Sequence, residues 1–92
     1  MIRLTQFIYV KEGMEETFDA FEEQVLPLLA RHEGRLVFRA RLSAVHTEIG
    51  SPYEVHLVEF PSEAHYHAFA ADEDRQRLLA LKEASVERVL SL

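Results

Sequence analysis

The sequence predicts an α+β fold in which helices cover a four-stranded antiparallel sheet and the elements follow the order βαββαβ. Three stretches read as strands from β-forming, partly alternating residues, and apolar residues recur at helical spacing between the first two. A turn-rich stretch then joins the second strand to the third. With 92 residues the chain is too short for two cores. We therefore expect a single domain over residues 1–92.

The first strand and the first helix are expected over residues 2–10 and from residue 14 onwards. The strand places Ile2, Leu4, Ile8 and Val10 on one face and Arg3, Thr5, Phe7 and Tyr9 on the other. Steps of three and four then stack apolar residues on one face of a helix, namely Met14, Phe18, Phe21, Val25, Leu28 and Leu29. Glu22 is assigned with the other acidic residues to the solvated face. Pro27 predicts a kink near Gln24, because proline removes a backbone hydrogen bond.

The second and third strands are expected over residues 35–46 and 53–60, after a helix stop at Gly34. Turn residues over 47–52 join the two strands as a hairpin. In the second strand Leu36, Phe38, Ala40, Leu42 and Ala44 share one face, and Arg35, Val37, Arg39, Arg41, Ser43 and Val45 share the other.

The register of this hairpin decides which side chains meet. We expect Val45 to pair with Val55, which places His46 beside Glu54 on the face that carries His56. The same register places Arg41 opposite Glu59. A slip of one residue would send His46 and His56 to opposite faces.

The remaining elements are a helix in two pieces and a last strand. Ser62 is a good N-cap for a helix over 63–71, and Asp72 begins a second segment that reaches about residue 84. Residues 86–92 read as the final strand. Since each crossover carries a helix, the order matches the ferredoxin-like arrangement, with both helices on one face of the sheet.

The opposite face of the sheet predicts a dimer. The first and third strands carry apolar residues on both faces, and helices on one side cannot cover both. A second copy of the chain, packed back to back, would cover the remaining face. We therefore expect a homodimer of the dimeric α/β-barrel type.

Composition limits the classes of partner and site. The formal net charge of −6 disfavours binding to a phosphate backbone, so we expect no nucleic acid partner. The absence of cysteine excludes disulfides and thiolate metal sites. No apolar run approaches about 20 residues, and the N-terminal residues do not resemble a signal peptide. We expect a cytoplasmic protein with no membrane partner.

Histidines supply the candidate catalytic residues. A carboxylate beside an imidazole orients it and raises its pKa, so we take His46, His56 and Glu54 as the candidate general base and its partners. The alternative is that these histidines simply pack at the end of the sheet or at a dimer interface. His65 and His67 point about 200° apart on a helix, so we expect no metal site. No cofactor motif is present.

Aromatic residues supply a candidate binding pocket for a small molecule. Candidate substrate contacts are Tyr9, Phe7, Tyr53, Tyr66 and Phe69, although such residues more often belong to a core. Arg41, with Arg35 and Arg39, is read first as an interface residue and second as an anion site.

Two stretches resemble an uncharacterised family, a domain of unknown function, within the ferredoxin-like dimeric α/β-barrel superfamily. They are residues 24–37 and 58–62, followed by Ala64, Phe69 and Lys82. The resemblance covers nearly the whole chain and implies a dimer with a small pocket between sheet and helices. The chain departs from the family pattern at Glu33 (usually glycine), Arg75 (usually tyrosine) and Lys82 (usually arginine), so a pocket lined by these positions is expected to differ.

Two functions remain open from the sequence. The first is a small-molecule-binding protein that takes an apolar or aromatic ligand. The resemblance implies that it could act like the superfamily's cofactor-independent monooxygenases or muconolactone-isomerase-like proteins. The second is a non-catalytic dimeric module without a functional pocket.

Overall fold

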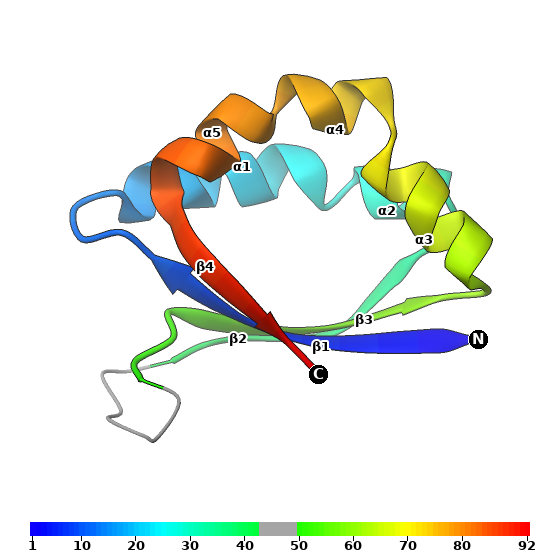
Figure 1. Cartoon of the computed structure of the whole chain (residues 1–92), viewed down its shortest axis with the longest axis horizontal. Coiled ribbons are helices and arrows are strands. Elements are labelled where there is room, and N and C mark those ends of the chain that lie inside the picture. The colour runs from blue at the N-terminus through cyan, green and yellow to red at the C-terminus, as the bar shows by residue number, and fades with distance from the viewer. Residues whose placement is uncertain (43–49) are drawn as a thin grey trace.

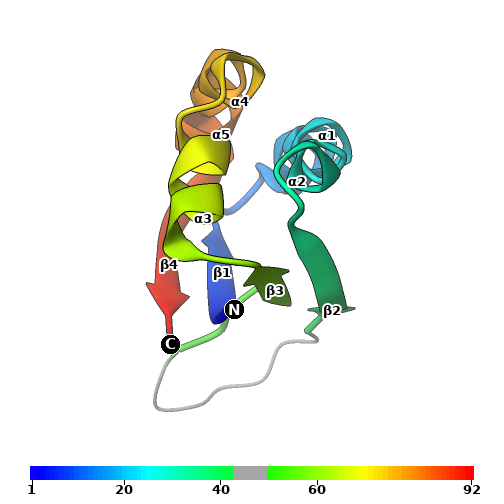
Figure 2. The ribbon, with the colours of Figure 1, turned by 90° about the vertical axis from the view of Figure 1, so that its right-hand side faces the viewer.

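The computed structural model describes residues 1–42 and 50–92, and its elements follow the predicted order. The strands are β1 (Ile2–Val10), β2 (Arg35–Arg41), β3 (Glu54–Phe60) and β4 (Val86–Ser91). The helices are α1 (Glu15–Val25), α2 (Leu28–Arg31), α3 (Glu63–Ala70), α4 (Glu73–Arg77) and α5 (Leu79–Ser85). The strands form one antiparallel sheet in the order β2-β3-β1-β4, and the helices lie on one face of it (Figure 1, Figure 2). The predicted ferredoxin-like fold class is confirmed.

Local sequence signals set the helix ends. The first helix breaks at Pro27, where α1 gives way to α2, as predicted from the loss of a backbone donor. Ser62 caps α3, because its Oγ accepts a hydrogen bond from the His65 backbone N–H at 3.3 Å. Asp72 caps α4 by accepting from the Asp74 N–H at 2.8 Å. Both predicted caps are confirmed.

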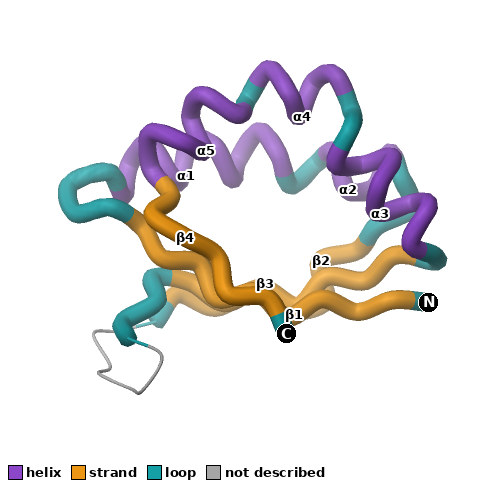
Figure 3. The backbone as a smooth tube through the Cα atoms, viewed as in Figure 1, coloured by secondary structure: helices purple, strands orange, loops and turns teal. Residues whose placement is uncertain are grey.

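The core lies between the sheet and the predicted apolar stripe of α1 and α2. Its buried stripe residues are Phe18, Phe21, Val25, Leu28 and Leu29, packed against residues of β1 and β3 that include Ile8, Val58 and Phe60. Figure 3 shows the strands on one side of the molecule and the helices on the other.

Glu22 lies in the core and not on the solvated face of the helix, where the sequence pattern predicts it. Its side chain is buried with 4% of its surface exposed. Glu22 is four residues after Phe18 and three before Val25, so at 3.6 residues per turn it lies on the same face as both. The core face of α1 therefore carries one carboxyl group.

The junction between α2 and β2 depends on residues 33 and 34. Glu33, not Gly34, takes the left-handed backbone conformation, with φ of 58°. Gly34 is required for a different reason. A Cβ at this position would lie 2.6 Å from Cε1 of the buried Phe60 ring. The expected helix stop is thus shared between two residues.

The β2–β3 hairpin is present, but the predicted register is wrong. Val55 pairs with Ala40, and Arg41 pairs with Glu54 rather than with Glu59. The strand also ends earlier than expected, since β2 stops at Arg41. Glu59 instead accepts hydrogen bonds from Arg3 and from Arg35, the latter at 2.9 Å.

A bulge in β2 explains why the predicted faces hold only in part: Phe38 and Ala40 share one face and Arg39 and Arg41 the other, but Leu36 and Arg35 lie on the faces opposite to those predicted. Leu36 pairs with Val58, the register shifts before Phe38, and Arg39 then pairs with His56. One extra residue reverses which side chains face the helices. Arg39 and Arg41 therefore share the helix-covered face, whereas Phe38 lies on the uncovered face with 54% of its surface exposed.

The uncovered face of the sheet is apolar over several strands, as predicted. It carries the half-buried residues Phe7, Val55, Leu57 and Leu90 beside the exposed Phe38. No described helix packs on it (Figure 2). The helices in the described ranges are all too short or too polar to cross a membrane.

Candidate functional site

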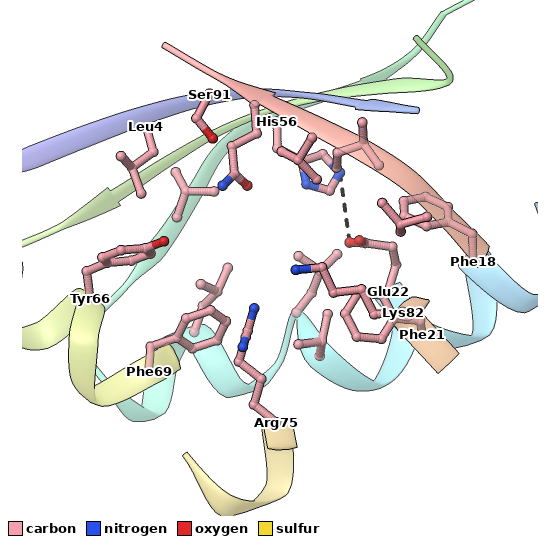
Figure 4. Close-up of a pocket in the computed structure, with 18 of the residues that line it drawn as sticks. Leu4, Phe18, Phe21, Glu22, His56, Tyr66, Phe69, Arg75, Lys82 and Ser91 are labelled. Carbon is pink, nitrogen blue, oxygen red and sulfur yellow. Dashed lines mark ion pairs between the residues drawn. The ribbon is translucent and has the colours of Figure 1, made fainter. Parts of the chain in front are cut away.

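A cavity of about 270 Å³ lies between the sheet and the helices (Figure 4). Most of its lining is apolar, from residues such as Phe21, Val58 and Phe69. The polar or charged side chains in its wall are Gln6, Glu22, His56, Tyr66, Arg75, Lys82 and Ser91. An apolar cavity of about 150 Å³ is enough to bind benzene. The cavity is therefore large enough for a small organic molecule.

Glu22 is the unusual group in this wall. Its Oε2 is buried and has no hydrogen-bond partner among the described residues. Burial first, and then the neighbouring Glu54 carboxylate, raise the pKa of Glu22 from 4.5 to about 7. Near neutral pH this carboxyl group exists in both protonation states, which suits a general acid or base.

His56 lies next to Glu22 in the cavity wall. The His56 Nε2 is 3.8 Å from Glu22 Oε2, as the dashed line in Figure 4 marks, and 2.6 Å from Glu54 Oε2. Burial lowers the pKa of His56 more than the Glu54 carboxylate raises it. A neutral ring that donates from Nε2 to Glu54 keeps Nδ1 as its acceptor.

Both carboxylate oxygens of Glu54, the hydrogen-bond partner of His56, accept hydrogen bonds. Its Oε2 accepts from Arg39 Nε at 3.1 Å, and its Oε1 accepts from Arg41 Nη2 at 3.1 Å. Burial acts to raise the pKa of Glu54, but the hydrogen bonds from Arg39 and His56 outweigh it and keep the pKa below its ordinary value. Glu54 is thus a fixed negative charge that orients His56.

A metal ion would find three donors here, but in a poor electrostatic setting. One ligand atom from each of Glu22, Glu54 and His56 lies within 4.8 Å of the others. Both Glu54 oxygens already accept from arginines. The positive charges of Arg39 and Arg41 oppose a bound cation, so the geometry favours proton transfer over metal binding.

Of the residues predicted to take part in chemistry, the structure brings His56 and Glu54 together. His56 lines the cavity and Glu54 holds its ring. His46 lies outside the described residues. The pairing expected between His46 and Glu54 depended on the incorrect hairpin register. In the observed register Arg41 lies opposite Glu54.

Of the residues predicted to bind a substrate, Tyr66 and Phe69 line the cavity. Phe7 and Tyr9 alternate with the cavity-lining Gln6 and Ile8, so they belong to the uncovered face of the sheet. There Phe7 pairs with Leu90, and Arg88 lies over the Tyr9 ring at 3.9 Å. Contact of any of these residues with a substrate stays a prediction.

Tyr53 and Arg41 also lie away from the cavity. The Tyr53 ring packs edge-on against Phe18 at 5.6 Å, and the Arg41 guanidinium lies 4.5 Å from the Tyr53 ring centre. Arg41 also donates to Asp19 at 2.6 Å. These contacts hold the end of the β2–β3 hairpin against α1.

The charged cavity residues that were missed as site candidates are Glu22, Arg75 and Lys82. The helical spacing from Phe18 and Val25 was the signal for Glu22. For Arg75 and Lys82 the available signal was their departure from the family pattern, and both line the cavity, whereas Glu33, the third departure, does not.

The fold and the cavity define a ferredoxin-like α+β protein with a ligand-sized space between its layers. Residues 7–92 match the family described as Domain of unknown function (DUF1330), and the chain belongs to this family. The resemblance noted in the sequence is thereby confirmed. No curated protein matches the chain.

Solved structures with the same fold come from several bacteria. RPA0582 of Rhodopseudomonas palustris, described as a protein of unknown function, has a TM-score of 0.81 at 16% identity, covering 98% of this chain and 77% of that one. A NIPSNAP domain protein of Burkholderia xenovorans has a TM-score of 0.71 at 15% identity, covering 99% and 90%. A dabb family protein of Mesorhizobium loti, described as having a ferredoxin-like fold, has a TM-score of 0.64 at 15% identity, covering 98% and 90%. At these identities the likeness shows the fold alone.

Proposed function

We propose that the protein is a homodimer whose cavity binds a small, largely apolar molecule and catalyses a proton transfer on it, as an isomerase does. The observation that carries this proposal is the buried Glu22 carboxyl, unpartnered at Oε2 among the described residues and titrating near neutral pH in the cavity wall. A carboxyl group in a mostly apolar site is a strong base when ionised, because water does not solvate its charge.

The reaction class follows from what the site can do. The Glu22 carboxylate takes a proton from a carbon next to a carbonyl group, and the C–H electron pair passes into the enolate. The protonated Glu22 then returns the proton to the same or to another carbon, which leaves the enzyme unchanged. His56 also lines the cavity, and its neutral ring, which donates from Nε2 to Glu54, has Nδ1 as an acceptor, so it is a second group that can hold the proton.

The uncovered sheet face supports the dimer. A face with Phe38 more than half exposed and Leu57 and Leu90 beside it leaves apolar surface in water. A second copy presents the same face, so two copies can pack around a twofold axis. The resemblance to the dimeric α/β-barrel superfamily points the same way.

The experiment measures deuterium incorporation into an enolisable ketone, phenylacetone, in D₂O by NMR. We expect the protein to accelerate exchange and Glu22→Gln to lower the enzyme-dependent rate about 100-fold, the usual contribution of a general base. Glu23→Gln is the matched control, because Glu23 is the next residue on α1 and is exposed. It should leave the rate unchanged.

Other outcomes of this experiment would favour the alternative functions. Binding of phenylacetone without accelerated exchange would favour a non-catalytic binding module, and no binding at all would favour a module without a functional pocket. Oxygen uptake in the same mixtures, followed with an electrode, would instead indicate monooxygenase-like chemistry.

A further inference from the structure

Two cationic side chains from the helix layer extend into the cavity. Arg75 of α4 and Lys82 of α5 both line it, and Figure 4 shows their nitrogen atoms directed toward its interior, opposite His56 and Ser91 of the sheet. Lys82 is half-buried and forms no ion pair with any residue in the described ranges. The cavity therefore holds positive charge that no ion pair within the described residues neutralises.

Arg75 is held in place but only partly satisfied. Its Nη1 donates to the Ala70 carbonyl at 3.3 Å, and its guanidinium carbon lies 5.3 Å from the centre of the Phe69 ring. Its Nε is buried and has no hydrogen-bond partner among residues 1–42 and 50–92. A buried donor without a partner costs free energy, and a ligand oxygen would remove that cost.

The charges around the two cations also favour an anion. Burial first, and then Arg75, lower the pKa of Lys82 and outweigh the opposing effects of Glu83 and Glu22, so the two cations lie near enough to act on each other. Among the described residues, the carboxyl group in the cavity wall is that of Glu22, which is only half ionised near pH 7 and lies beyond ion-pair distance of Lys82. This cationic cavity belongs to a chain with a net charge of −6, so the inward orientation of these two residues is not a consequence of a basic surface.

We propose that the ligand of this cavity is a small apolar carboxylate whose carboxylate group is held by Arg75 and Lys82. This inference rests on the proposed function and names its substrate class. The planar guanidinium suits a carboxylate, and the ammonium supplies a second charge-assisted hydrogen bond. The apolar body of the ligand lies against Phe21, Val58 and Phe69. At about 270 Å³ the cavity has room for one ring with a short side chain.

The test compares two probes of nearly the same shape, phenylacetate and phenylacetamide, by isothermal titration calorimetry. Because a charge-assisted hydrogen bond is stronger than a neutral one, we expect phenylacetate to bind at least about tenfold more tightly than the amide. Arg75→Met and Lys82→Met should each reduce this preference to within about twofold while still binding the amide. Retained amide binding shows that the variants are folded.

Arg77→Met is the matched control, since Arg77 lies on the same helix as Arg75 and its side chain is 73% exposed. It should keep the preference for the acid. Equal affinity for both probes, or a preference retained in both cavity variants, would overturn the carboxylate assignment and leave the cavity as a neutral binding site. Failure of both probes to bind would overturn the proposed function as well.

Discussion

Glu22 Oε2 lies 3.8 Å from His56 Nε2, and both side chains are buried between the helix layer and the sheet. They come from different layers, since Glu22 is on α1 and His56 is on β3. Glu54 orients the histidine and acts through its charge on both groups, raising the pKa of Glu22. The pair is thus a carboxyl group that titrates near pH 7 beside an imidazole that stays neutral.

The titration of Glu22 predicts a dependence of stability on pH. Its pKa is about 7 in the folded protein and 4.5 ordinarily, so the folded state keeps a proton that the unfolded chain releases. The stability this provides is full below pH 4.5 and is lost as the pH rises through about 7. Urea denaturation from pH 4.5 to 8 should show the native chain losing up to about 3 kcal/mol relative to Glu22→Gln. Parallel curves for the two proteins would contradict the raised pKa.

Removing the Glu54 charge should lower the pKa of His56 further. Burial already lowers it, and the Glu54 carboxylate opposes that effect through its hydrogen bond and its charge. NMR titration of the His56 ring in Glu54→Gln is therefore expected to give a lower pKa than in the native chain. Asp19→Asn is the control, because Asp19 contacts Arg41 but not His56. An unchanged pKa of His56 in Glu54→Gln would contradict the role of this carboxylate in orienting the histidine.

Truncation of the α1 stripe should be costly. Phe18 is fully buried and Phe21 is 5% exposed, so Phe18→Ala and Phe21→Ala are each expected to lower the free energy of unfolding by about 3–5 kcal/mol through the cavity that they leave. Chemical denaturation measures the loss. Values below about 1 kcal/mol at both positions would resemble surface substitutions and would contradict the packing.

The junction at residues 33 and 34 predicts opposite effects for two neighbouring substitutions. Glu33→Gly should stabilise the fold by about 0.5–1 kcal/mol, because glycine takes positive φ without steric cost. Gly34→Ala should destabilise it by about 1–3 kcal/mol, because the new methyl group would overlap the buried Phe60 ring. Thermal unfolding of both variants tests the two predictions. If both substitutions stabilised the fold, or both destabilised it, the backbone conformation at residues 33 and 34 would be contradicted.

Disruption of the uncovered sheet face should dissociate the dimer. Phe38→Glu places a charge on a side chain that is 54% exposed in the single chain, so folding should be little affected. Sedimentation at micromolar concentration is expected to show a dimer for the native chain and a monomer for Phe38→Glu. Ala80→Glu adds the same charge at an exposed position of α5 and should remain dimeric. A monomeric native chain would refute the proposed assembly.

Local signals in the sequence determined the elements and their order. The stripe from Phe18 to Leu29, the break at Pro27 and the caps at Ser62 and Asp72 all depend on contacts within a few residues along the chain. Such interactions are visible in a sequence because helix geometry fixes which neighbours meet. Rules for connections between strands and helices allow few topologies for this order of elements, and the ferredoxin-like arrangement is one of them.

The site was decided by contacts between residues far apart in the sequence. One bulge near Val37 turns Arg39 and Arg41 toward the helices, where both donate hydrogen bonds to Glu54. The alternation of apolar and polar residues in the sequence does not reveal such an extra residue. Glu22 carries its pKa near 7 because of what covers it and because Glu54 lies nearby. The cavity likewise exists only where Arg75 and Lys82 of the helices face His56 of the sheet. Burial and electrostatic coupling are properties of the packed layers, so only the tertiary structure could decide them.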